Sequence, residues 1–183
     1  MIFLQVAKVI KYLIYLCLEI FLPEQFKKTM SKIAVFPGSF DPITLGHQDI
    51  ITRALPFFDK LYIGVGVNID KKYMFTLEQR VKWIQQVFKE YKNIEVVGYK
   101  GLTVDFCRNV GAKFIIRGLR TSADFEFERI IGQVNKQLYP EIETIYLLSA
   151  NEYSSLNSSI VRDLLINGGD VSQFVPSRLD IKL

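Results

Sequence analysis

Five short runs of consecutive apolar residues alternate along the chain with stretches in which apolar residues recur every three to four positions. The runs cover 33–36, 61–67, 94–97, 114–116 and 144–148. Such runs are typical of strands that are buried on both faces of a parallel sheet. The stretches between them predict helices at 46–55, 76–88, 103–110, 122–138 and 158–166. The alternation predicts an α/β fold, a Rossmann-like doubly wound sheet of five parallel strands flanked by helices.

Local signals mark where several of these helices begin and end. Thr76-Leu77-Glu78-Gln79 has the spacing of a capping box, and Gly168-Gly169 is a typical helix stop. The helix at 122–138 carries one apolar stripe, the pattern of a helix that buries one face. The stripe consists of Phe127, Ile130, Ile131, Val134 and Leu138.

At 183 residues, 49% of them apolar, the chain suits one domain or one domain with an appendage. Residues 1–29 differ from the rest because they are strongly apolar, yet their longest uncharged stretch, 12–18, is too short to span a bilayer. Residues 22–25 offer no signal-peptide cleavage site. Two interpretations stay open for this N-terminal extension: it precedes a true start at Met30, or it is an amphipathic membrane anchor. The folded domain is predicted at 30–183.

The net charge of +4 comes from basic residues that are spread along the chain, with no run of four or more. A small anionic ligand explains this balance at least as well as nucleic acid does, so we expect no nucleic-acid partner. We also expect no membrane partner, because of the two interpretations of residues 1–29 we favour the start at Met30. Cys17 and Cys107 have no metal-binding or CxxC spacing. They predict reduced thiols in a cytoplasmic protein.

Candidate chemistry begins at the sequence FPGSFDPITLGH, residues 36–47, which contains the only histidine of the chain. An apolar strand runs into a Pro-Gly turn and then into the start of a helix. Unpaired N–H groups and the helix dipole make such a loop an anion site. A lone histidine is often a packed residue, but its place at a helix N-terminus favours a functional His47. The positive helix end lowers an imidazole pKa and predicts a neutral donor.

Three more segments leave the carboxyl ends of predicted strands, where ligands bind in sheets of this kind. Lys71 and Lys72 follow the second strand, as phosphate-binding cations or as an ordinary solvated pair. Arg117-Gly118-Leu119-Arg120 follows the fourth strand and can grip separate phosphoryl groups. Residues 153–159 are rich in serine, which caps helices and also binds polyphosphate.

Acidic residues follow the second arginine, at Asp124, Glu126 and Glu128. Acids in the first turns of a helix offset its dipole, which is a structural role. Glu128 could instead contact a ribose or a cation, and the sequence alone leaves these options open.

Together these segments resemble the phosphopantetheine adenylyltransferase family, of the nucleotidyltransferase superfamily with the (H/T)xGH motif. The resemblance runs from about Ser31 to the C-terminus and rests on GSFDPITLGH at 38–47, KKYMFTLEQR at 71–80, IRGLRTSADFEFE at 116–128 and the segment at 153–159. It implies that ATP and 4′-phosphopantetheine give dephospho-coenzyme A and pyrophosphate with Mg²⁺. It also implies direct in-line attack with no covalent intermediate, and a homohexamer.

The resemblance implies a role for each matching residue. His47 stabilises the transition state at the α-phosphate. The expected ATP contacts are Ser39, Phe40, His47, Gly118, Leu119, Arg120, Glu128, Tyr153, Ser154, Ser155, Leu156, Asn157, Ser158 and Ser159. The expected 4′-phosphopantetheine contacts are Ser39, Lys71, Thr103 and Arg117. No protein residue is expected to ligate the metal, because ATP phosphates carry Mg²⁺.

The chain departs from the family pattern at a few positions. Asn157 stands where many members have a serine, Ser39 where many have threonine, and Gly101 near a usual acidic residue. The alternatives are a nicotinamide or nicotinate mononucleotide adenylyltransferase, which usually has histidine at the position of Thr44, and a non-catalytic nucleotide-binding module. A Rossmann oxidoreductase is disfavoured because no GxGxxG follows the first strand.

Overall fold

A computed structural model describes residues 31–68, 71–179 and 181. The interpretations of residues 1–29 fall outside these ranges. Within them the strands are β1 (Ile33–Gly38), β2 (Lys60–Val67), β3 (Ile94–Lys100), β4 (Phe114–Leu119) and β5 (Glu143–Leu148). They form one parallel sheet in the order β3-β2-β1-β4-β5, so the predicted fold class is confirmed.

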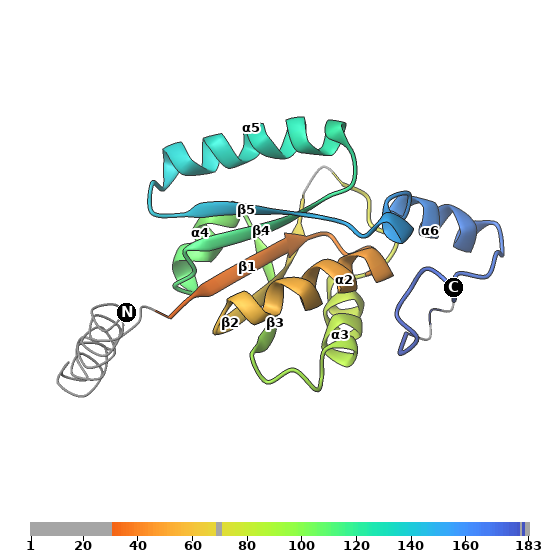
Figure 1. The fold of residues 1–183 in the computed structure, drawn as a ribbon. Helices are drawn as coiled ribbons and strands as arrows, with labels where there is room; N and C mark the ends of the chain where they lie inside the picture. Colours follow the sequence, from red (N-terminus) through yellow and green to blue (C-terminus); the bar gives the residue numbers. More distant parts are fainter. Residues whose placement is uncertain (1–30, 69–70, 180, 182–183) are drawn as a thin grey trace, which may run out of the picture. The chain divides into compact units, whose positions relative to one another are not determined.

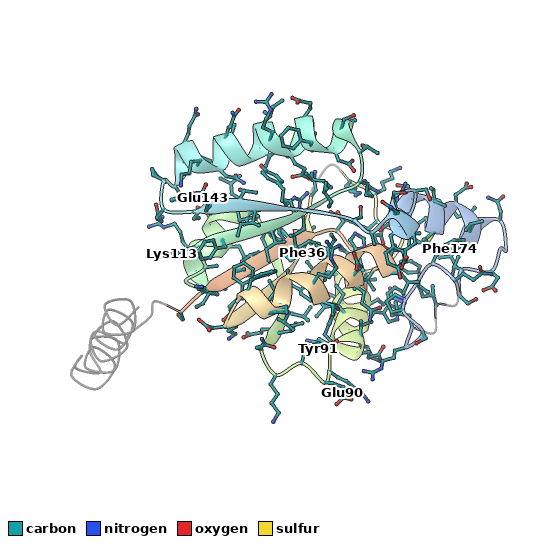
Figure 2. The ribbon with its side chains drawn as sticks, in the orientation of Figure 1. Phe36, Glu90, Tyr91, Lys113, Glu143 and Phe174 are labelled. Carbon is teal, nitrogen blue, oxygen red and sulfur yellow. The ribbon has the colours of Figure 1, made fainter. Side chains whose placement is uncertain are left out.

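The strand order reverses at β1, because β2 and β3 lie on one side of it and β4 and β5 on the other. A ligand crevice is expected beyond the carboxyl ends of β1 and β4, at this switch. Figure 2 shows which end this is: Lys113 and Glu143 lie at the amino ends of β4 and β5, on the left, and Phe174 lies near α6 (Ser158–Ile166), on the right.

Helices cover both faces of the sheet (Figure 1). The main apolar core lies between the sheet and the helices α2 (Leu45–Ala54) and α3 (Leu77–Val87). A second core lies on the other face, where α4 (Thr103–Asn109) packs against β1 and β4. The five helices agree with the predicted ones to within one residue at each end, α5 (Ser122–Leu138) and α6 to the residue. None of the helices in the described ranges has the length and apolar character that crossing a membrane requires.

Three strands run further at their carboxyl ends than predicted: β3 continues to Lys100, and the other two are β1 and β4. Pro37 and Gly38 continue β1 and pair with β2, and Arg117 to Leu119 continue β4 and pair with β5. The segments interpreted as loops are therefore the last residues of strands. This difference matters, because a strand holds the Arg117 side chain in a fixed direction.

The apolar stripe of α5 is not buried, so the prediction that this helix buries that face is wrong for the described chain. Phe127 is 65% exposed and Ile130 54% exposed, and Glu128 is the buried residue of the helix. The opposite face contacts the sheet through polar groups, since Tyr146 donates to the Glu128 carbonyl at 3.0 Å. A Cβ at Gly132 would lie 2.3 Å from the Tyr146 oxygen, so glycine lets the helix approach this tyrosine.

Candidate active site

A cavity of about 320 Å³ opens at the carboxyl ends of β1 and β4. The residues predicted for the site that line it are Ser39, Phe40, His47, Lys71, Arg117, Gly118, Arg120, Glu128, Tyr153, Leu156, Asn157 and Ser158. Leu119, Ser154, Ser155 and Ser159 do not line it, and Thr103 borders a different cavity. The sequence interpretation missed Thr44, Gly46, Ile50 and Ser149 in the lining.

His47 belongs to a capping box at the start of α2. The Thr44 N–H donates to the imidazole Nδ1 at 3.0 Å, and the His47 N–H donates to Thr44 Oγ1 at 3.4 Å. A nitrogen that accepts from a backbone N–H carries no proton, so the neutral ring is protonated at Nε2. The spacing T-x-x-H could have shown this, because α3 begins with the same arrangement between Thr76 and Gln79.

The pKa of His47 is lowered from 6.5 to about 4, first by burial and then by the positive charges of Arg120 and Arg117. The predicted lowering of the His47 pKa is confirmed. Its causes differ from the expected one, because burial and two arginines lower the pKa, whereas we expected the positive end of the helix to do so. A neutral imidazole with its proton on Nε2 is a hydrogen-bond donor at neutral pH.

Phe40 shapes the loop between β1 and α2. Its φ of +48° lies in the left-handed region, which costs about 1 kcal/mol or more for a residue with a side chain. The ring folds back over Gly38, where a Cβ would lie 2.7 Å from it. It also meets the His47 ring edge to face, with centroids 5.2 Å apart. Glycine at 38 is therefore needed for the phenyl ring that packs against His47.

The cationic side chains reach the cavity from two segments, the chain after β2 and the end of β4. Lys71 Nζ donates to Ser39 Oγ at 3.2 Å. Arg117 donates from Nε to Glu128 at 2.7 Å and from Nη2 to the other carboxylate oxygen, while its Nη1 donates to the Pro37 carbonyl at 2.7 Å. Three of the five N–H groups of the Arg117 guanidinium are thus used in these hydrogen bonds, and two remain available to a ligand.

The two acids that line the cavity, Glu128 and Asp124, each pair with an arginine. Glu128 is 8% exposed and pairs with Arg117. Asp124 pairs with Arg120, whose Nε and Nη2 donate to it at 3.1 and 3.2 Å. Each arginine of the cavity is therefore oriented by one carboxylate from α5.

The serine-rich segment contributes fewer free groups than expected. Asn157 caps α6, since its Oδ1 accepts the Ile160 N–H at 3.0 Å, and its side-chain NH₂ remains a donor. Ser158 Oγ donates to the Pro42 carbonyl at 2.8 Å, and Ser154 Oγ to Asn151 at 2.7 Å. The cavity is thus bordered here by the N-terminus of α6 and the Asn157 amide.

A second cavity, of about 120 Å³, shares Pro37, Arg117 and Glu128 with the first. The rest of its lining combines apolar, hydroxyl and amide groups: Thr103, Ile115, Ile131, Gly132, Asn135 and Thr144. Thr103 is oriented by Tyr99, with the two hydroxyl oxygens 2.8 Å apart. Arg117 therefore borders both the larger, cationic cavity and this smaller one.

The side chains that line the cavity do not form a set of protein ligands for a metal ion. Within the described ranges no three His, Cys, Asp or Glu side chains gather as metal ligands. The two carboxylates of the cavity both pair with arginines. A divalent ion fits this site only if the ligand supplies its oxygen atoms.

The model of the cytidylyltransferase-like family matches residues 35–164. A phosphopantetheine adenylyltransferase of Flavobacterium psychrophilum is 54% identical over 149 residues, which are 81% of this chain and 98% of the relative. The chain belongs to the phosphopantetheine adenylyltransferase family. A member from Lachnoclostridium phytofermentans is 50% identical over 81% of this chain and 91% of its own length. Members of this family are nucleotidyltransferases, so the expected enzyme class is confirmed.

Solved structures of nucleotide adenylyltransferases share the fold. A bifunctional NMN adenylyltransferase/ADP-ribose pyrophosphatase of Francisella tularensis aligns with a TM-score of 0.62 at 20% identity, over 80% of this chain and 45% of that one. A candidate nicotinate-nucleotide adenylyltransferase of Vibrio parahaemolyticus also gives 0.62, at 21% identity, over 81% of this chain and 90% of that one. At such identities the similarity shows the fold alone. The two phosphopantetheine adenylyltransferases, in contrast, are identical to this chain at half or more of the aligned positions.

Proposed function

We propose that the chain transfers the adenylyl group of ATP to 4′-phosphopantetheine, which yields dephospho-coenzyme A and pyrophosphate. The observation that carries the proposal is one cavity in which a neutral histidine, Lys71, Arg117 and Arg120 meet at the N-termini of two helices. The names of the relatives supply the acceptor, phosphopantetheine, and the adenylyl group that is transferred. Cations and helix N-termini suit a ligand with several phosphates.

The reaction needs positioning and charge stabilisation. A phosphate oxygen of 4′-phosphopantetheine attacks the α-phosphorus of ATP, and the bond from that phosphorus to the oxygen bridging to the β-phosphate breaks, releasing pyrophosphate. His47 donates its Nε2 proton as a hydrogen bond to an α-phosphate oxygen, where charge is redistributed in the transition state. Because the imidazole is neutral, it need not lose a proton before or after the step.

Different side chains of the cavity bind each of the two substrates. Lys71, Ser39 and Arg117 hold the phosphate of 4′-phosphopantetheine, and Arg120 with the start of α6 holds the polyphosphate of ATP. Arg117 borders both cavities, so a phosphate bound to it leaves the attached pantetheine chain beside Thr103 and Asn135. Amides of that chain find hydrogen-bonding partners there, and Ile131 supplies an apolar contact.

Family membership indicates a divalent-metal requirement, and we propose Mg²⁺ bound by the ATP phosphates. The pairing of both cavity carboxylates with arginines supports this view. The ion neutralises phosphate charge, and Arg120 and Lys71 orient the polyphosphate that carries it.

We also propose that the chain forms a homo-oligomer, with the hexamer expected from the family resemblance. The apolar face of α5 supports an assembly, because exposed side chains of this size rarely form a stripe on a monomer. This α5 face consists of Phe127, Ile130, Ile131, Val134 and Leu138, with Leu148 of β5 also exposed.

We also propose a cytoplasmic location, and an N-terminal extension, residues 1–29, that lies outside the folded domain. Cys107 is a buried free thiol whose pKa burial raises to about 12, which suits a reducing compartment without requiring one. Expression of 30–183 alone tests the extension: full solubility and activity support a start at Met30, and binding to lipid vesicles only with residues 1–29 present supports the anchor.

Pyrophosphate release tests the activity. Purified protein with ATP and Mg²⁺ should release pyrophosphate when 4′-phosphopantetheine is added, and mass spectrometry should detect dephospho-coenzyme A. Nicotinamide mononucleotide is the matched control substrate. Release with the mononucleotide and none with 4′-phosphopantetheine would replace the proposed substrate by the alternative. ATP binding without release from either would favour the non-catalytic module.

A further inference from the structure

Arg80 is a buried charged side chain that the reaction proposed above does not use. It lies in the first turns of α3, is 1% exposed and does not line the cavity. Asp41 is equally buried, at 1%, in the loop between β1 and α2. Burying a charge costs several kcal/mol unless it is paired and hydrogen-bonded, so both groups need a structural or functional reason.

The hydrogen bonds of Arg80 join three separate segments. Its Nη1 donates to the Ser39 carbonyl at 2.5 Å and to the Gly66 carbonyl, at the end of β2, at 3.4 Å. Its Nε donates to the carbonyls of Phe75 and Thr76 at 3.2 and 3.3 Å. One guanidinium thus ties the loop after β1 to the end of β2 and to the start of α3.

Asp41 ties the same loop to the same segment from the other direction. Its two carboxylate oxygens accept the N–H groups of Met74 and Phe75, each at 3.0 Å. The segment 71–76 also carries Lys71, whose Nζ donates to Ser39 Oγ. The two buried charges therefore fix the relative position of Ser39 and Lys71, the groups assigned above to the substrate phosphate.

The bond to the Ser39 carbonyl also orients a backbone donor. In a trans peptide the carbonyl and the next N–H point in opposite directions. With the Ser39 carbonyl held by Arg80 outside the cavity, the Phe40 N–H points to the other side, and Phe40 lines the cavity. Since Phe40 has a φ of +48°, this peptide needs an external partner to keep its orientation.

We propose that Arg80 and Asp41 are positioning residues, which hold Ser39, the Phe40 N–H and Lys71 as a preformed site for a phosphoryl group without touching the ligand. The proposal rests on the proposed function for the identity of the phosphate. The decisive variant is Arg80→Lys, which keeps the charge but cannot reach the carbonyls of Ser39, Gly66 and Phe75 together.

Ile84→Val is the matched control, because Ile84 lies on the same helix, is fully buried in the main core and does not line the cavity. Both variants should melt at a lower temperature than the wild type. At a temperature where both are folded, kcat/KM for adenylyl transfer should fall about tenfold or more in Arg80→Lys. Ile84→Val should stay within about twofold of the wild type.

Inorganic phosphate, titrated calorimetrically into the folded proteins, separates positioning from stability, because it matches the single phosphoryl group assigned to Ser39 and Lys71. Its dissociation constant should rise about fivefold or more in Arg80→Lys and stay unchanged in Ile84→Val. Equal phosphate affinity in the wild type and Arg80→Lys would overturn the proposal. If Arg80→Lys does not fold, Asp41→Asn, which loses one carboxylate acceptor, should show the same change, and its absence would also overturn the proposal. A wild type that binds phosphate but makes no product would refute the proposed function alone.

Discussion

The neutral state of His47 leads to a stability prediction that needs no substrate. In the unfolded chain an imidazole takes up a proton as the pH falls through 6.5, whereas in the folded protein His47 stays neutral until about pH 4. Between these values the unfolded state binds the extra proton. The unfolding free energy of the wild type must therefore fall as the pH falls through this window, and His47 adds no slope above it.

The size of the effect follows from the two pKa values. Linkage with 6.5 and about 4 gives a loss of about 2 kcal/mol between pH 7 and pH 4.5 from this one side chain. The matched variant is His47→Gln, because glutamine already fills the same capping position in α3, where the Thr76 N–H donates to Gln79 Oε1 at 3.0 Å. Glutamine can keep the cap of α2 while removing the titration.

Urea unfolding of both proteins at pH 7, 6, 5 and 4.5 gives the measurement. Carboxylates that titrate in this range contribute to both proteins alike, so the difference between the two curves isolates His47. We expect the wild type to lose about 2 kcal/mol more than His47→Gln over the range. Parallel curves would mean that His47 is protonated in the folded state as easily as in the unfolded one, and the argument for a neutral donor would be refuted.

Three further predictions concern the site and the α5 face. His47→Ala should lower kcat by about 10²–10³-fold with little change in the dissociation constant of ATP, measured by turnover and by calorimetry; a large loss of ATP affinity would make His47 a ground-state contact. Glu128→Gln should lower kcat/KM by about tenfold or more, because Arg117 loses the carboxylate that orients it, and unchanged turnover would show that Pro37 suffices. Ile130→Asp should give a smaller particle in sedimentation equilibrium with an unchanged circular dichroism spectrum, while an unchanged mass would place the interface elsewhere.

The sheet was predictable because its strands are buried on both faces, which forces unbroken apolar runs into the sequence. Strand ends were harder to place. Arg117 and Gly118 look like loop residues, but β5 continues to pair with them as far as Leu119. That pairing depends on a strand about 30 residues away in sequence, so the residues around Arg117 alone do not predict it.

The α5 face was misjudged for a different physical reason. An apolar stripe shows that a helix face leaves water, but it does not show whether the covering surface belongs to the same fold. Here the sheet-facing side of α5 uses Glu128 and Gly132, to pair with Arg117 and to admit Tyr146. Only the side-chain contacts in the structure show which face of α5 packs against the sheet and which is exposed.

Arg80 and Asp41 were missed because each looks like an ordinary surface residue, an arginine within a polar stretch of helix and an aspartate beside a proline. Their burial follows from the meeting of the loop after β1, the end of β2 and the start of α3, which is a tertiary fact. Candidate residues named from the sequence were those that face a ligand, since ligand chemistry restricts residue type. The groups that hold such residues in place need only satisfy the requirement that a buried charge is paired or hydrogen-bonded. Many combinations of residues meet this requirement, so no particular residue type or spacing marks such groups in a sequence.

The causes of the lowered His47 pKa also determine how the site responds to its ligand. Arg120 and Arg117 are the second and third causes of the lowered pKa, and bound phosphates would offset their charge and raise the pKa. Burial is the largest cause, and a bound nucleotide can only exclude more water from the cavity. The ring should therefore remain neutral at pH 7 with substrate present, and Nε2 should remain a donor. Burial is thus the contribution that persists in the complex, so we expect the histidine to keep the same protonation state in the proposed reaction.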